Sequence, residues 1–74
     1  MITYEEALKK AKALKPNIDA CDEYDIAYLF KSKADEFTIG GDGPCVILKE
    51  DGRAINQLEF VDNYDHEHIR EFKL

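Results

Sequence analysis

The sequence predicts a single α+β domain, spanning residues 1–74, in which an N-terminal helix packs on an antiparallel sheet. Three patterns lead to this prediction: an amphipathic helical segment at the start, an alternating segment near residues 24–31, and an apolar run followed by Asp51-Gly52. The chain has 74 residues, which suffices for one hydrophobic core but not for two.

The first helix is expected at residues 4–14. Thr3 suits the N-cap position, and Glu6 three residues later completes a capping box. One apolar stripe at helical spacing is formed by Tyr4, Ala7, Leu8, Ala11 and Leu14. Pro16 disfavours helical conformation at the residue before it, so we expect the helix to end there.

A strand is expected at about residues 24–31, where β-favouring residues alternate with others. Its first side would carry Tyr24, Ile26, Tyr28 and Phe30. Residues 32–44 are expected to form mostly connection, within which Phe37 and Ile39 could anchor a loop or a very short strand.

A hairpin is expected after Pro44. The run Cys-Val-Ile-Leu-Lys at 45–49 is typical of a central strand, and Asp51-Gly52 suits a tight turn. Residues 54–60 would return as the partner strand. The apolar phase slips near Asn56-Gln57, which indicates either a β-bulge or an early end of that strand.

The C-terminal segment allows two interpretations. Asn63 or Asp65 could cap a helix in which Ile69 and Phe72 share one side, so a short C-terminal helix at about 65–72 is preferred over a strand. The sheet would then have three strands, or four if residues 37–39 or the tail add an edge strand.

Charge and composition limit the classes of partner. The chain has 16 acidic and 10 basic residues and a formal net charge of −6. Nucleic acid and anionic membranes favour basic surfaces, so neither is expected as a partner, whereas the charge permits a basic protein partner. The other interpretation is that the acidity only aids solubility. The composition leaves a homo-oligomer open.

The two cysteines and the N-terminal segment indicate the cellular compartment in which the protein is expected. No apolar signal segment and no long apolar run is seen, so we expect a cytoplasmic protein in which Cys21 and Cys45 are reduced and structural. In an exported protein the two could instead form a disulfide.

Two segments carry residue types used in binding or catalysis. The glycines at 40, 41 and 43 suggest a phosphate loop, but a strand is expected after them and Asp42 would repel a phosphate, so we interpret them as a turn. His66 and His68 would point apart on a helix and share a side on a strand, where weak zinc or nickel binding is conceivable; solvated capping residues are preferred. No catalytic residues, cofactor or metal are therefore expected.

The acidic residues between 17 and 30 form the most one-sided charge in the chain. They are Asp19, Asp22, Glu23 and Asp25, and no basic residue lies among them. The segment lacks the glycine and glutamate spacing of an EF-hand. One interpretation is a solvated loop and strand edge; the hypothesis we carry forward is a partner-binding face for a basic protein.

Several of these segments resemble the YrhB-like family, also called the immunity protein 35 family of bacterial toxin systems. The resemblance rests on Thr3-Tyr4-Glu5-Glu6-Ala7 with Lys10-Ala11, on Tyr28-Leu29-Phe30, on Gly41-Asp42-Gly43-Pro44 with Val46, Ile47, Lys49, Asp51 and Gly52, and on the segment from Tyr64 through Phe72. It implies a non-enzymatic, cytoplasmic protein that binds and neutralises a cognate toxin, or a chaperone-like binder.

Two alternatives remain. The opening helix pattern and the hairpin also resemble PepSY-type inhibitory domains, most of which are exported; the missing signal segment places that resemblance second. A third hypothesis is a small subunit of an enzyme or ligand-binding protein whose site is completed only by oligomerisation.

Overall fold

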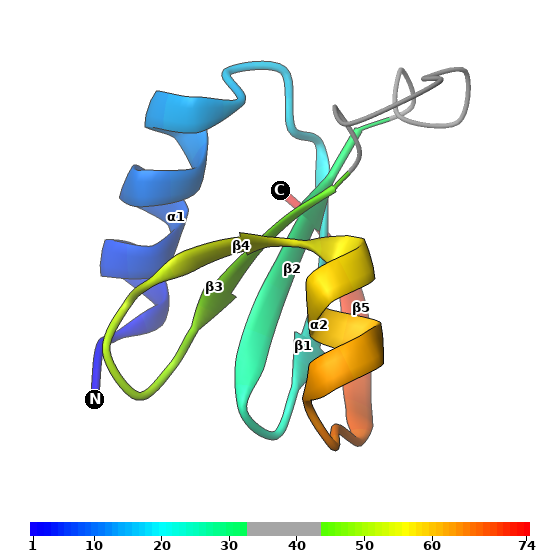
Figure 1. The fold of residues 1–74 in the computed structure, drawn as a ribbon. Coiled ribbons are helices and arrows are strands. Elements are labelled where there is room, and N and C mark those ends of the chain that lie inside the picture. The colour runs from blue at the N-terminus through cyan, green and yellow to red at the C-terminus, as the bar shows by residue number, and fades with distance from the viewer. Residues whose placement is uncertain (33–43) are drawn as a thin grey trace.

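A computed structural model describes residues 1–32 and 44–74, which form a five-stranded antiparallel sheet with one helix packed on each face (Figure 1). Along the chain the elements are α1 (Tyr4–Leu14), β1 (Ala20–Tyr24), β2 (Ala27–Lys31), β3 (Cys45–Leu48), β4 (Ala54–Asn56), α2 (Gln57–Asn63) and β5 (His68–Lys73). The strand order across the sheet is β4-β3-β2-β1-β5. The α+β class and the N-terminal helix on an antiparallel sheet are thus confirmed.

The sheet has a hydrophobic core on each face. All four residues of β3 are buried, and because neighbouring side chains point to opposite faces they serve both cores. On the α1 side, the core consists of Ala7, Ala11, Ile18, Cys21, Phe30, Cys45 and Ile47. On the α2 side, it consists of Ala27, Leu29, Val46, Leu48, Ile55 and Phe60.

Local signals place α1 and the β3–β4 hairpin as predicted. The Thr3 hydroxyl accepts a hydrogen bond from the Glu6 amide at 3.2 Å, as a capping residue should. Small residues Ala7 and Ala11 face the sheet, which lets the helix approach β3 and β2 closely. Gly52 takes a left-handed φ of 74° in the turn, and its amide donates to the Leu48 carbonyl at 2.8 Å.

The predicted strand at 24–31 is wrong as a single element. It is a hairpin in which β1 ends at Tyr24 and β2 begins at Ala27, so Tyr24 and Tyr28 belong to different cores. Asp25 and Ile26 make the turn without a positive φ, and therefore without the glycine or asparagine that usually marks such a turn. The turn is held instead by distant backbone groups, because the Lys49 amide donates to the Ile26 carbonyl at 2.9 Å.

The C-terminal half also differs from the prediction. Of the two explanations for the phase slip, the early strand end is correct: β4 stops at Asn56, whose side chain caps α2 by accepting from the Glu59 amide at 2.7 Å. The short second helix is therefore at 57–63, and the helix predicted at 65–72 is wrong. That segment forms β5 because pairing with β1 along the strand outweighs the weak local helical signal. The tail thus supplies an edge strand, and the sheet has five strands rather than three or four.

Some predictions fall on residues outside the described ranges. These are the short strand at Phe37 and Ile39 and the turn formed by the glycines at 40, 41 and 43.

Candidate functional site

The acidic segment lies mainly on β1, and the strand divides it between the two faces of the sheet. Asp22 is opposite Leu29, whose side chain packs on the α2 side, and Glu23 is opposite Tyr28, which packs on the α1 side. Opposed residues of an antiparallel pair project to the same face, so Asp22 and Glu23 point away from each other. The structure therefore does not bring these two carboxylates together.

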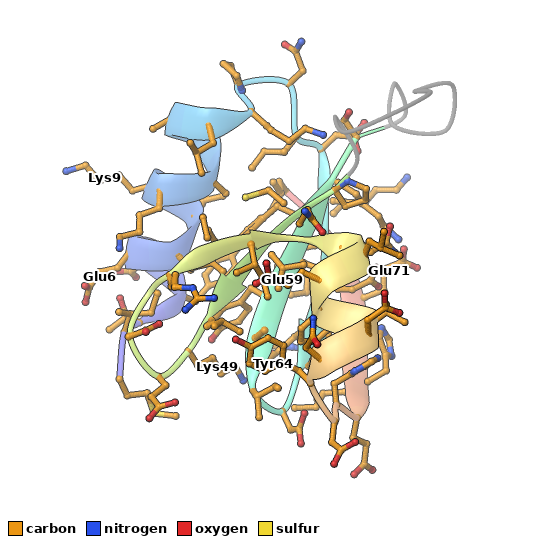
Figure 2. All side chains as sticks on the ribbon, viewed as in Figure 1. Glu6, Lys9, Lys49, Glu59, Tyr64 and Glu71 are labelled. Atoms are coloured by element: carbon orange, nitrogen blue, oxygen red, sulfur yellow. The ribbon has the colours of Figure 1, made fainter. Side chains whose placement is uncertain are left out.

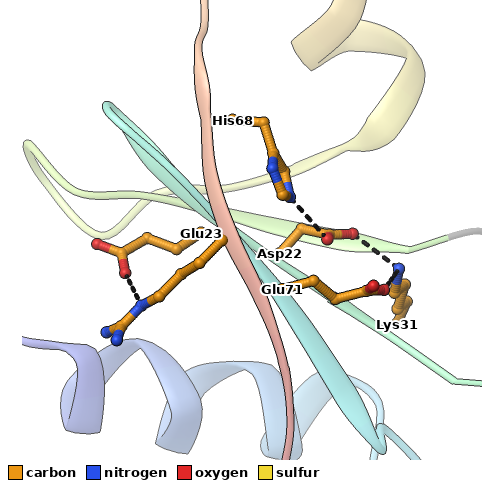
Figure 3. Close-up of polar contacts among 6 residues, drawn as sticks. Asp22, Glu23, Lys31, His68 and Glu71 are labelled. Carbon is orange, nitrogen blue, oxygen red and sulfur yellow. Dashed lines mark hydrogen bonds and ion pairs between the residues drawn. The ribbon is translucent and has the colours of Figure 1, made fainter.

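On the α2 side, the Asp22 carboxylate contacts Lys31 and His68, which come from the two neighbouring strands (Figure 3). Its Oδ2 lies 2.8 Å from Lys31 Nζ on β2, and its Oδ1 lies 3.0 Å from His68 Nε2 on β5. Lys31 also contacts the Glu71 carboxylate on β5. This group links three adjacent strands on the same face.

On the α1 side, Glu23 makes a second ionic group. Its Oε2 lies 2.9 Å from Lys49 Nζ, and its Oε1 lies 2.8 Å from Arg70 Nε. Lys49 Nζ also sits 4.8 Å from the centroid of the Tyr28 ring. Only 14% of the Glu23 side chain and 12% of the Lys49 side chain are exposed, so this pair is shielded from most of the solvent.

The acid–base equilibria reflect these contacts. Burial of the Asp22 carboxyl favours its neutral form, but hydrogen bonds from Lys31 and His68 outweigh burial and lower its pKa. Hydrogen bonds from Lys49 and then Arg70 lower the pKa of Glu23. The same contact with Asp22 raises the pKa of Lys31. Both carboxylates are thus held ionised by groups of this chain.

The other two acids of the predicted face lie beyond opposite ends of β1. Asp19 precedes the strand and Asp25 follows it, six residues later, which in extended chain is a distance of about 20 Å. Asp25 Oδ1 accepts a hydrogen bond from the Glu67 amide at 2.9 Å, which fixes the β1–β2 turn against the start of β5. The four acids therefore occupy two faces and two ends rather than one surface, and whether any of them binds a partner stays a prediction.

Sequence reasoning missed an open pocket of about 420 Å³ at one end of the sheet. It is lined by Met1, Asp25, Ile26, Leu48, Lys49, Glu50 and Tyr64. Figure 2 labels two of the lining residues, Lys49 and Tyr64. No local pattern marks the pocket, because its residues come from the N-terminus, two turns and the C-cap of α2.

The pocket combines apolar walls with carboxylates at its edge. Ile26, Leu48 and Tyr64 provide the apolar surface, while Asp25 and Glu50 are exposed. The ammonium group of Lys49 is already bound by Glu23, which limits its effect on the charge of the pocket. The arrangement suits a ligand group with an apolar body and a positive charge.

The histidines pack against aromatic rings. The rings of His66 and His68 lie 5.1 and 5.2 Å from the Tyr24 ring, and His66 Nδ1 lies 2.9 Å from the Tyr64 carbonyl oxygen. Within residues 1–32 and 44–74, no group of three or more potential ligand residues is placed to hold a metal ion.

The cysteines are both free and buried on the α1 side. Cys21 and Cys45 are each opposite Phe30, on either side of β2, so their Cα atoms are two strand spacings or about 9–10 Å apart. A disulfide requires less than about 7 Å, so the fold excludes a Cys21–Cys45 bond. Burial raises the pKa of the Cys21 thiol to about 12 and also raises that of Cys45.

Comparison with known proteins found no relative. No protein-family model, curated protein or solved structure matches the chain. Neither helix in the described part of the chain has the length and apolar character needed to cross a membrane.

Proposed function

We propose that this chain is a non-enzymatic binding protein of the immunity type, which neutralises a cognate toxin by covering a basic surface on it. The observation that supports this is the pocket, in which apolar walls are bordered by exposed carboxylates. Protein interfaces commonly have an apolar centre that anchors a large side chain and a charged border that guides association.

The contact surface is the acidic pocket end, which we define as the pocket together with Asp25, Glu50, Asp65 and Glu67. All four residues are exposed, and the hydrogen bond between Asp25 and the Glu67 amide holds two of them side by side. Of the four acids predicted from the sequence to bind a partner, this surface includes Asp25. Asp22 and Glu23 lie in ion pairs with other residues of this chain.

The partner is expected to insert a lysine or arginine side chain into the pocket. Such a side chain would pack its methylene groups on Ile26, Leu48 and Tyr64 and place its charge near Asp25 and Glu50. The net charge of −6 would also accelerate association with a basic protein at low salt.

The test begins with affinity capture from the native cell extract and identification of the bound protein. The captured protein should inhibit growth when expressed alone and be harmless when co-expressed with this chain. Its association rate with Glu50→Lys should fall about ten-fold at low salt, because a charge at the edge of an interface acts mainly on association. Asp19→Lys is the matched control, since it changes net charge equally at the other end of β1.

Two results would overturn the proposal. If Glu50→Lys and Asp19→Lys weaken binding to the purified partner equally, the acidic pocket end is not the contact surface. If no captured protein is neutralised by this chain, or if the chain itself turns over a substrate, the immunity-type function is wrong.

A further inference from the structure

The outer edge of β5 carries unpaired backbone groups. β5 stands last in the strand order, and in the described part of the chain no strand pairs with its far side. The strand at the other edge, β4, has only three residues and leads directly into α2. β5 has six residues, so it is the longer of the two exposed edges.

Two residues of β5 direct their backbone groups outward. The Leu74 amide donates to the Asp19 carbonyl at 3.0 Å, in register with the pairing of Ala20 and Lys73. Inward and outward groups alternate along an antiparallel strand, so Phe72 also faces β1, while Glu71 and Lys73 face outward. These two residues could form backbone hydrogen bonds with another strand.

We propose that β5 pairs antiparallel with β5 of a second copy of this chain, with Phe72 of one copy opposite Phe72 of the other. In this register Glu71 of each copy is opposite Lys73 of the other. The outward backbone groups of these residues then form the hydrogen-bonded pairs, and their charges attract. A twofold axis perpendicular to the sheet relates the copies and joins the two sheets edge to edge.

The charges of the opposed residues favour this register of the β5 pair over the other registers. In an antiparallel pair, opposed side chains project to the same face, whereas neighbouring residues of one strand project to opposite faces. The residue at the twofold axis must therefore lie opposite the same residue of the other copy. Centring the pair on Arg70, Glu71 or Lys73 would place like charges opposite each other, which is destabilising. Only the register centred on Phe72 joins an apolar pair with two opposite-charge pairs.

The side chains at this edge fit the two faces of such a pair. Phe72 lies on the α1 side, where its ring centroid is 5.4 Å from that of Tyr4 and 5.2 Å from the Arg70 guanidinium carbon. Glu71 and Lys73 are exposed. Charged residues on an edge strand normally prevent unspecific pairing, and here their order permits one specific partner.

The pairing of β1 with β5 shifts register between Glu23 and Tyr24, so only the C-terminal part of β5, from Arg70 onward, is regularly paired. The contact is therefore short, so we expect a weak dimer that forms at high protein concentration. This inference concerns the edge of the sheet and is independent of the acidic pocket end.

The test uses two charge reversals whose effects cancel only in a mixed dimer. Glu71→Lys alone places lysine opposite lysine, and Lys73→Glu alone places glutamate opposite glutamate. Sedimentation equilibrium should show the wild-type dimer, and each variant alone should have a dissociation constant raised at least roughly ten-fold, because two cross-strand pairs change from attraction to repulsion. An equimolar mixture of the two variants should dimerise again, since every opposed pair then has opposite charges.

Glu71→Lys also removes the contact with Lys31, so Lys31→Gln serves as the control and should dimerise like the wild type. In addition, hydrogen exchange at the amides of Glu71 and Lys73 should slow as protein concentration rises. A wild-type chain that stays monomeric, single variants that associate normally, or a mixture that does not dimerise would each overturn the proposal.

Discussion

Replacing Glu23 with glutamine should destabilise the fold rather than abolish binding. The change keeps the volume of the side chain but removes the charge that pairs with Lys49 and Arg70. The Arg70 side chain is 67% exposed, so its pair contributes at most about 1 kcal/mol. Lys49 is largely shielded and would lose its counterion, which costs about 1.5–3 kcal/mol for a hydrogen bond to a charged group.

Glutamine can still accept a hydrogen bond from Lys49, so we expect the free energy of unfolding to fall by about 2 kcal/mol in total. For a domain of this size such a loss lowers the melting temperature by roughly 8–16 °C. Urea denaturation followed by circular dichroism measures it. Glu67→Gln is the control, because it makes the same substitution at an exposed side chain and should change stability by less than about 0.5 kcal/mol.

The pH dependence gives an independent check on the cause. The pKa of Glu23 is lowered in the folded protein by hydrogen bonds from Lys49 and then Arg70. A lowered pKa adds stability that is present above the unfolded value of about 4.3 and disappears as pH falls through the folded value. The difference in stability between wild type and Glu23→Gln should therefore shrink below about pH 4. A difference that stays constant from neutral to acidic pH, or no difference at all, would refute this reasoning.

Two further predictions follow from Gly52 and from the buried thiols. Gly52→Ala should lower the free energy of unfolding by about 1–3 kcal/mol because alanine disfavours a left-handed backbone. Its Cβ would also lie 2.8 Å from Lys10 Nζ and 3.1 Å from Ile2 Cγ2. Urea denaturation measures the loss, which Gly52→Asn should reduce; equal losses would contradict a conformational cause. Cys21 and Cys45 should react with a thiol reagent only after unfolding, because burial raises both pKa values; fast labelling of folded protein at neutral pH would contradict this.

The elements predicted correctly from the sequence depend on local interactions. Thr3 and Glu6 determine the start of α1 within four residues, and Gly52 supplies the positive φ that the β3–β4 turn requires. The turn at Asp25-Ile26 was missed because it has no such signal and is held by contacts with Lys49 and Glu67, which are distant in sequence. Local pattern therefore predicts an element only where the forces that hold it are local.

The same limit explains why the C-terminal strand and the pocket were not predicted. The helical spacing of Ile69 and Phe72 is compatible with a helix, but only pairing with β1 makes the segment a strand, and that pairing is not visible in the segment itself. The pocket could not be predicted because its walls come from four separate parts of the chain. Four acids close in sequence suggested one surface, whereas a strand directs neighbours to opposite faces.

The position of β1 in the sheet explains why charged residues occupy an inner strand. α1 packs mainly on β3 and β2, and α2 mainly on β4 and β3, so β1 lies to one side of both helices. On this strand the carboxylates of Asp22 and Glu23, each with 14% of its side chain exposed, pair with cations on β2, β5 and the β3–β4 turn. Because these cations come from segments on both sides of β1, the ion pairs of Asp22 and Glu23 link β1 to its neighbours. Asp25 and Glu50, by contrast, are exposed and lie in two turns that line the pocket.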